Sequence, residues 1–169
     1  NHPENKKYIT LGEYRNKKLI ILDFWATWCS PCVASLDKLA PIYKQNSADL
    51  ALLPVAAHQG PSISQAEAMM KEKHWSIPSV LDGDQYLFTK VFPPPSGKGI
   101  PHMIWIKDNK VIAIPKTAYA TAENIKKAIN NEQLEIQMDT AVPFNMWVPM
   151  DISTKQLQVK LQAMVVQKS

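Results

Sequence analysis

Cysteine is scarce in this chain of 169 residues: only Cys29 and Cys32 occur, three positions apart. A disulfide framework that stabilises a small secreted domain needs more cysteines at wider spacing. A tetrahedral zinc site would need two further ligands, and His58, His74 and His102 lack the paired spacing of zinc ligands. We therefore interpret the two cysteines as a reactive pair and expect no bound metal. An inert structural disulfide is the alternative interpretation.

Long apolar runs are also missing, since no uninterrupted stretch approaches the roughly 20 residues that a bilayer-spanning helix needs. We therefore expect no membrane span in this chain. The 19 basic and 15 acidic residues give a net charge of +4, but they are spread along the whole sequence. Because no basic footprint and no zinc-finger or RNA-recognition spacing occurs, we exclude nucleic acid as a partner.

What is present is an alternation of apolar strand patterns and helical patterns. Nearly continuous apolar runs indicate strands that are buried on both faces, whereas apolar residues at three- and four-residue steps indicate helices. The predicted elements are a strand over 19–25, a helix over 31–45, a strand over 50–57, a helix over 62–73, a hairpin over 102–106 and 111–114, and a helix over 121–131. Residues 76–100 are interpreted as irregular, with an obvious proline-rich loop at 93–97.

This order of elements predicts an α/β fold with a mixed central sheet flanked by helices. The first strands are parallel through helical crossovers, and the last two are antiparallel through a tight turn. We assign these elements to one domain, residues 1–131, followed by a C-terminal extension, residues 132–169. Alternating apolar residues over 134–138 and 157–163 predict two extended segments in that extension. A helix over 157–165 is the competing prediction.

The cysteines lie where the first predicted strand ends and the first predicted helix begins. A helix N-terminus has unpaired N–H groups and a partial positive charge, and both favour the thiolate of Cys29, which is the attacking species. Cys32, one turn into the helix, is close enough to close a disulfide or to resolve a mixed one. Pro31 between them fixes one φ angle. This arrangement is typical of a site for thiol–disulfide chemistry.

The residues around these cysteines resemble a known family. The segment 23–32, DFWATWCSPC, is similar to the active-site segment of the thioredoxin superfamily. The segment 99–106, GIPHMIWI, is similar to the strand that begins with the cis-proline of that superfamily. Together with 75–82 and the Asp108-Asn109 turn, these motifs resemble the TlpA-like branch of extracytoplasmic thiol–disulfide oxidoreductases over residues 8–131. The resemblance implies a thioredoxin fold.

The resemblance also implies catalytic roles. It makes Cys29 the nucleophile, Cys32 the resolving thiol, and Asp23 the buried acid that exchanges a proton with the second cysteine. A hydrogen-bonded structural acid is the alternative for Asp23, since a carboxylate in an apolar strand is unfavourable without partners or a purpose. The chain departs from the pattern at Ser30, where glycine is usual, and at Ser35, where several relatives have glutamate.

Substrate contacts are implied at three further positions. Trp28 corresponds to the aromatic residue that flanks the first cysteine, and Pro101 corresponds to the cis-proline. Ile100 and Pro101 are expected to offer backbone groups to an extended substrate chain. A thioredoxin fold that only docks a partner through the Pro101 groove, without redox turnover, is an alternative interpretation.

The expected function is that of a thiol–disulfide oxidoreductase, acting as a reductase. Its partners would be a protein or small-molecule disulfide and an upstream thiol reductant, and its only cofactor would be its own reversible disulfide. The resemblance implies an extracytoplasmic place, the bacterial periplasm, with a membrane anchor upstream of Asn1 as an option. A copper(I) carrier that uses Cys29 and Cys32 as soft ligands is a further alternative.

Overall fold

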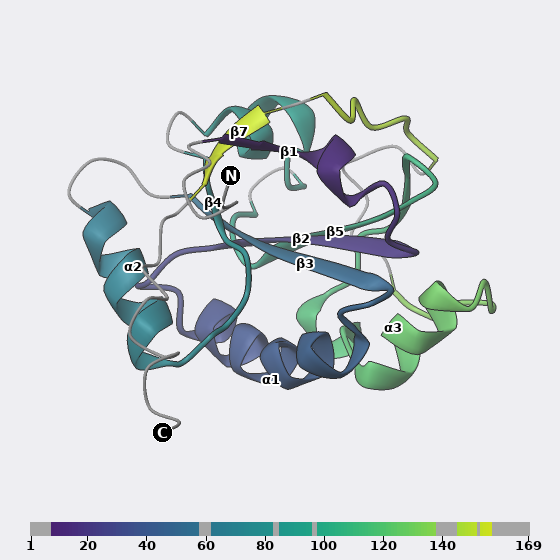
Figure 1. Ribbon diagram of the computed structural model, residues 1–169, viewed down its shortest axis with the longest axis horizontal. Helices are drawn as coiled ribbons and strands as arrows, with labels where there is room; N and C mark the ends of the chain where they lie inside the picture. Colours follow the sequence, from purple (N-terminus) through teal and green to yellow (C-terminus); the bar gives the residue numbers. More distant parts are fainter. Residues whose placement is uncertain are drawn as a thin grey trace, which may run out of the picture.

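The computed structural model describes residues 8–57, 62–82, 85–95, 98–137, 145–151 and 153–156. Their core is a seven-stranded mixed sheet with strand order β1-β7-β4-β3-β2-β5-β6 (Figure 1). The strands are β1 (Tyr8–Thr10), β2 (Leu19–Trp25), β3 (Leu50–Ala56), β4 (Val80–Leu81), β5 (His102–Lys107), β6 (Lys110–Ala113) and β7 (Ser153–Gln156). The α-helices are α1 (Ser30–Asn46), α2 (Ser62–Glu72) and α3 (Ala122–Ile129). The predicted α/β class, with a mixed sheet flanked by helices, is confirmed.

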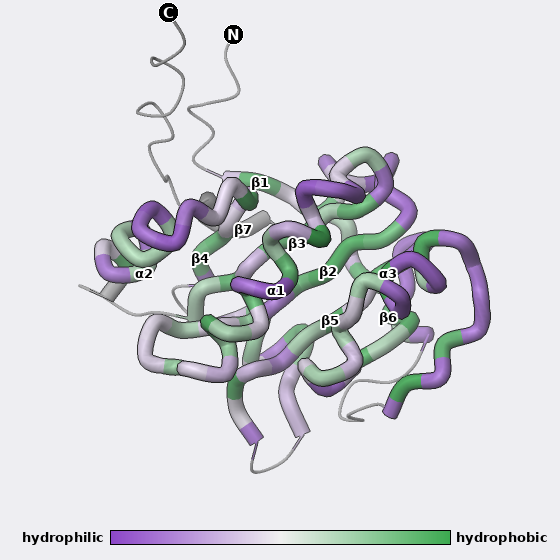
Figure 2. Tube along the Cα trace, turned by 90° about the horizontal axis from the view of Figure 1, so that it is seen from below, coloured by the Kyte–Doolittle hydropathy of each residue, from purple (hydrophilic) through white to green (hydrophobic). Residues whose placement is uncertain are grey.

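Strand β2 is the centre of the sheet. It pairs in parallel with β3 and antiparallel with β5, and all seven of its residues are buried. A continuous apolar run suits this place because both faces of the strand are covered. Figure 2 shows β2 and β3 as largely apolar stretches among the more hydrophilic helices and loops.

The two faces of the sheet are covered differently. Helices α1 and α3 lie along one face (Figure 1), where Ile21 and Trp25 of β2 join a core cluster that contains both cysteines. Leu22 and Phe24 point to the other face, as the alternation of side chains along a strand requires. That face is covered by short helical turns at 11–14 and 87–91 and by the buried side chains of Val148 and Met150.

The hairpin and the last helix agree with the sequence in detail. Strands β5 and β6 are joined by Asp108 and Asn109, both with positive φ, which is the conformation of the tight turn that matches the twist of a hairpin. Helix α3 begins after Thr121, whose hydroxyl accepts a hydrogen bond from the backbone N–H of Asn124. The predicted start of this helix is therefore confirmed.

The prediction that residues 76–100 are irregular is wrong at two places. Val80–Leu81 forms strand β4, and Leu87–Val91 forms one turn of π-helix. The buried carboxylate of Asp82 explains the turn, because it accepts hydrogen bonds from the backbone N–H groups of Leu87 and Phe88, at 3.1 and 2.9 Å. Because Asp82 lies five and six positions before Leu87 and Phe88, this interaction does not follow the spacing of a common capping pattern and was not predictable from the local sequence.

Part of the C-terminal extension belongs to the same sheet. Residues 145–148 run beside β6, where Val111 exchanges backbone hydrogen bonds with Asn145 and Met146, each 3.0 Å long. Strand β7 then lies between β1 and β4, at the other side of the sheet. The boundary after residue 131 stays a prediction about domain organisation.

The two extended segments predicted in the extension are only partly described. Residues 132–137 have no regular secondary structure, although Leu134 and Ile136 pack against the core cluster that contains the cysteines. Met138 and residues 157–163 lie outside the described residues. The strand that the structure does show, β7, directly precedes the second predicted segment.

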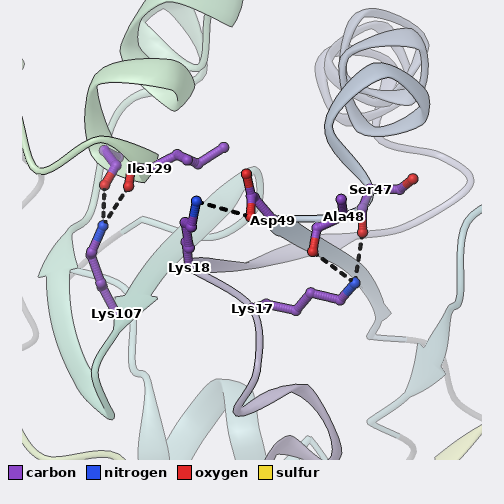
Figure 3. Close-up of polar contacts among 8 residues, drawn as sticks. Lys17, Lys18, Ser47, Ala48, Asp49, Lys107 and Ile129 are labelled. Carbon is purple, nitrogen blue, oxygen red and sulfur yellow. Dashed lines mark hydrogen bonds and ion pairs between the residues drawn. The ribbon is translucent and has the colours of Figure 1, made fainter.

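Two lysines, Lys17 just before β2 and Lys107 at the end of β5, cap the C-terminal ends of helices (Figure 3). The Nζ of Lys17 donates to the carbonyls of Ser47 and Ala48, at 2.6 and 3.2 Å, just beyond the last turn of α1. The Nζ of Lys107 donates to the carbonyls of Ala128 and Ile129, at the end of α3. Burial lowers the pKa of Lys107. A cation is favourable at a helix C-terminus because the last carbonyls are unpaired there.

In the part of the chain that the structure describes, no helix combines the length and the apolar character that crossing a membrane requires.

Replacing Lys17 by methionine should lower the free energy of unfolding by about 1 kcal/mol, because the carbonyls after α1 lose a charged donor. Urea denaturation at fixed ionic strength measures this change. Lys44→Met is the matched control, since Lys44 also lies in the last turn of α1 and is exposed. If both variants lose the same stability, the two hydrogen bonds of Lys17 contribute nothing beyond the general attraction of a cation to the helix end.

Candidate functional site

The two cysteines form a disulfide at the start of α1. Cys29 is the N-cap residue of the helix and Cys32 lies in its first turn, with 5.3 Å between their Cα atoms. The disulfide leaves 4% of the surface of Cys29 exposed and none of Cys32. Access from solvent to this site therefore runs through Cys29.

The backbone holds Cys29 at the helix N-terminus. Its N–H donates to the carbonyl of Ala26, at 3.0 Å, and its carbonyl accepts from Val33, at 3.1 Å. Its Sγ accepts from the N–H of Cys32, at 3.3 Å. Pro31 takes the second helical position, where a missing N–H costs nothing. A sulfur that faces a helix N–H is placed where negative charge is favourable, so the geometry supports a stabilised thiolate once the disulfide is reduced.

Asp23 lies within β2 and is fully buried. Because side chains alternate along a strand, Asp23 shares the face of Ile21 and Trp25, which is the face that α1 covers. Its cross-strand neighbours are Pro54 of β3 and Met103 of β5. Neither side chain can donate a strong hydrogen bond, and among the described residues neither carboxyl oxygen has a partner.

This environment changes the protonation of Asp23. Burial raises the pKa of its carboxyl group to about 8, since the charged form loses hydration and gains no partner. Near neutral pH the group is therefore mostly protonated and can both give and accept a proton. The alternative that Asp23 is a hydrogen-bonded structural acid finds no hydrogen bond among the described residues.

Ile100 and Pro101 lie at the cysteine end of the sheet. The pairing of β2 with β5 sets Phe24 opposite His102, so Pro101 comes next to the end of β2. The chain leaves β2 at that end and reaches Cys29 four residues after Trp25. The Ile100–Pro101 peptide bond is cis. The topology thus brings together two segments that are about 70 positions apart in the sequence.

Trp28 lies in the short loop between β2 and α1, directly before Cys29. Its side chain is 76% exposed, an unusual state for a large aromatic residue. An exposed indole beside a reactive sulfur offers apolar contact area to a bound molecule. The other tryptophan of this segment, Trp25, is fully buried and belongs to the core.

A contact that the sequence does not reveal fixes helix α1 relative to Trp25, near the disulfide. The indole N–H of Trp75 donates to Asp37 of α1, at 2.9 Å, and the ring packs edge-on against Trp25, with centroids 5.6 Å apart. Lys73 forms an ion pair with the same carboxylate, also at 2.9 Å. Asp37 and Trp75 are 38 positions apart, so only the fold places them together.

Known proteins match this chain in sequence and in structure. A family model described as Redoxin matches residues 2–131. The thiol–disulfide oxidoreductase ResA of Bacillus subtilis is 33% identical over 81 residues, which cover 48% of this chain and 44% of that protein. The chain thus spans less than half the length of the curated relatives that it matches.

Solved structures share the fold. StoA of Bacillus subtilis superposes with a TM-score of 0.51 and 24% identity, covering 67% of this chain and 84% of that protein. The pneumococcal exposed lipoprotein thioredoxin of Streptococcus pneumoniae gives a TM-score of 0.57 and 24% identity, with coverages of 72% and 89%. The Redoxin match includes β2, both cysteines and the Ile100–Pro101 segment. This chain therefore belongs to the Redoxin family and has a thioredoxin fold.

Proposed function

We propose that this protein is a thiol–disulfide oxidoreductase that reduces disulfides of proteins or small molecules. The observation that carries the proposal is the Cys29–Cys32 disulfide at the N-terminus of α1, with the Sγ of Cys29 facing the N–H of Cys32. An inert structural disulfide has no need of a helix N-terminus or of a buried acid on the same face of the sheet. The names of the matched relatives support the same chemistry.

The reaction is a two-step exchange. In the reduced protein the thiolate of Cys29 attacks one sulfur of a substrate disulfide, forms a mixed disulfide and releases the first substrate thiolate. The thiolate of Cys32 then attacks the Sγ of Cys29, which breaks the mixed disulfide and releases the second substrate thiolate. The Cys29–Cys32 disulfide forms again, and two electrons and two protons have passed to the substrate. An upstream thiol reductant restores the dithiol.

Asp23 would assist the second step. Cys32 must lose its proton before it can attack, and an acceptor works best when its pKa is close to that of the donor. Burial raises the pKa of Asp23 to about 8, near the usual value of about 8.5 for a free thiol. A proton can then move from Cys32 to the carboxylate form of Asp23 with little free-energy difference.

Substrate binding is assigned to Trp28, Ile100 and Pro101. The exposed indole of Trp28 would pack against apolar groups next to the substrate disulfide. Pro101 has no N–H and so leaves the approach to Cys29 free of a competing donor. The backbone of Ile100 would pair with an extended substrate chain in the manner of an added strand.

The compartment and cofactor follow from this chemistry. We assign no cofactor other than the reversible disulfide itself. An oxidising compartment supplies the disulfide substrates, so we propose an extracytoplasmic place, the bacterial periplasm, with an anchor upstream of Asn1 as one arrangement. The pneumococcal exposed lipoprotein thioredoxin offers a precedent in its name.

The order of thiol reactivity tests the proposal. The reduced protein should be alkylated first at Cys29, because this sulfur faces the helix N-terminus and keeps some exposure, whereas Cys32 is fully buried. Reduced Cys32→Ser should accumulate mixed disulfides with disulfide-containing substrates, because Cys29 still attacks and nothing resolves the product, and Cys29→Ser should not. Peptide mass mapping after brief iodoacetamide treatment measures the order, and faster labelling of Cys32 would reverse the two roles.

Insulin reduction distinguishes the proposed oxidoreductase from the two alternative functions, a docking module and a copper(I) carrier. The native protein should be active and Cys29→Ser inactive. An inactive native protein that still binds unfolded chains would favour the docking module, and stoichiometric copper(I) uptake that depends on both thiols would favour the carrier.

The stability of the oxidised protein should fall as the pH rises from about 4 to about 8. The folded state holds the proton of Asp23 up to about pH 8, whereas the unfolded chain releases it near pH 4, so folding is favoured at low pH. Asp23→Asn should remove this dependence and be more stable above pH 8, by up to the order of 5 kcal/mol. Urea unfolding at pH 5 and at pH 8.5 measures this change in the free energy of unfolding. Asp49→Asn is the control for the loss of an ordinary carboxylate, because Asp49 lies in an exposed ion pair with Lys18.

The same Asp23→Asn variant should also resolve mixed disulfides more slowly while alkylation of Cys29 stays nearly unchanged. A variant that is more stable and turns over as fast as the native protein would show that Asp23 has no part in the chemistry.

The reduction potential should lie below roughly −200 mV, nearer to thioredoxin at about −270 mV than to the oxidant DsbA at about −120 mV. A high potential requires a strongly stabilised thiolate, and Ser30 and Pro31 between the cysteines carry no charge that would add to the helix N-terminus. Equilibration with glutathione buffers, followed by tryptophan fluorescence, measures the potential. A value near that of DsbA would make the protein an oxidase rather than a reductase.

A further inference from the structure

His102 directly follows the substrate-binding pair Ile100 and Pro101, yet its side chain takes no part in the proposed chemistry. We propose that His102 is a positioning residue, which fixes the segment that carries Ile100 and Pro101 and thereby sets the affinity for extended protein substrates. This inference rests on the proposed function, because it assigns a role to the binding of a polypeptide at that segment.

A hydrogen bond between His102 and Phe92 joins the two ends of the segment that carries Ile100 and Pro101. The Nε2 of His102 lies 3.0 Å from the carbonyl oxygen of Phe92, ten positions earlier in the chain. A carbonyl oxygen only accepts hydrogen bonds, so Nε2 carries the proton and donates. The imidazole is 4% exposed, which makes this bond costly to lose, since water cannot replace it.

Phe92 is itself held from the other side. Its N–H donates to the carbonyl of Leu87, at 2.7 Å, and the N–H of Leu87 donates to the buried carboxylate of Asp82. The N–H of Asp82 donates to the carbonyl of Ala56, at the end of β3, at 3.1 Å. A continuous series of hydrogen bonds therefore connects the central sheet to the Phe92 carbonyl that His102 contacts.

Aromatic packing fixes the orientation of the imidazole. The ring stacks on Phe24, its partner in the β2–β5 register, with centroids 5.7 Å apart and planes 28° from parallel. Phe88 meets it edge-on, at 6.1 Å and 77°. With one ring on its face and another at its edge, the imidazole has little freedom to turn away from Phe92.

The described residues between the two anchors, 93–95 and 98–101, are tightened by their own composition and contacts. Three consecutive prolines follow Phe92, and each has a restricted φ angle. The N–H of Lys98 donates back to the carbonyl of Pro95, at 2.9 Å. These constraints at the described positions, together with the anchors at Phe92 and His102, hold Ile100 and Pro101 in one place relative to the end of β2.

This constraint matters only for a substrate that uses the backbone of the segment. A polypeptide pairs with it along several residues, so a mobile segment would have to be ordered on binding at a cost in affinity. A small disulfide needs only the sulfur of Cys29 and bypasses the segment. Comparing a polypeptide substrate with a small disulfide therefore separates an effect on substrate binding at this segment from an effect on the reactivity of Cys29.

The test compares His102→Leu and His102→Gln in the full chain. With insulin as substrate, His102→Leu should raise KM about tenfold at little change in kcat, the factor that one lost hydrogen bond of ordinary strength gives. With dithiobis-nitrobenzoate, and in the alkylation rate of Cys29, it should match the native protein. His102→Gln can place an amide N–H near the position of Nε2 and should restore KM to within about twofold of the native value.

His74→Leu is the matched control. His74 is exposed and has a φ of 53°, a conformation that histidine accepts more readily than leucine, so this variant loses stability without touching the segment. It should leave both KM values unchanged. If it raises KM for insulin as His102→Leu does, stability rather than positioning explains the effect and the proposal is wrong.

Two further outcomes distinguish failure of the proposed function from failure of the positioning role of His102. A native protein that reduces neither substrate refutes the proposed function itself. A native protein that is active, together with an unchanged KM for His102→Leu or an equal loss on both substrates, refutes only the positioning role. Should His102→Leu fail to fold, Asp82→Asn weakens the other anchor and carries the same expectation for insulin, and an unchanged KM in that variant also overturns the proposal.

Discussion

Burial of β2 on both faces is the constraint on which the rest of the structure depends. Because this strand has neighbours on both edges and covered faces on both sides, its position is fixed by β3, β5, α1 and the segments opposite. The chain emerges from its end directly into the loop that carries Trp28 and Cys29. The position of Cys29 is therefore set by the end of β2 and the start of α1, together with its backbone hydrogen bonds to Ala26 and Val33.

The same burial explains why a carboxyl group in β2 can be useful. Asp23 has only Pro54 and Met103 as cross-strand neighbours, so nothing in the strand plane compensates its charge. Burial therefore raises the pKa of this carboxyl group to about 8, near the ordinary value of about 8.5 for a free thiol. The buried carboxyl group lowers the stability of the folded state at neutral pH, and the proposed function uses the same group as a proton acceptor for Cys32.

Local patterns were enough to predict the central strands, the helices and the cysteine pair, because each depends on neighbours within a few positions. The strand predicted from the apolar run 19–25 and the helix predicted to begin at residue 121 are examples. What the sequence could not show depends on long-range contacts. Asp82 caps a turn that lacks a capping pattern, and β7 finds its place between two strands that precede it by more than 70 positions.

Alternation along β2 divides the site between two faces of one strand. Asp23 and Trp25 point toward α1 and the cysteines, whereas Phe24, between them, points to the opposite face and stacks on His102. In the proposed function, proton transfer and the anchoring of the Ile100–Pro101 segment therefore depend mainly on two different core clusters, which share the backbone of β2 and the side chain of Ile100. Because substitutions without shared contact partners are close to additive in energy, we expect those in the His102 cluster that do not touch Ile100 to alter substrate affinity while leaving the proposed thiol chemistry intact. A fold built in this way can change its substrates without changing its reaction.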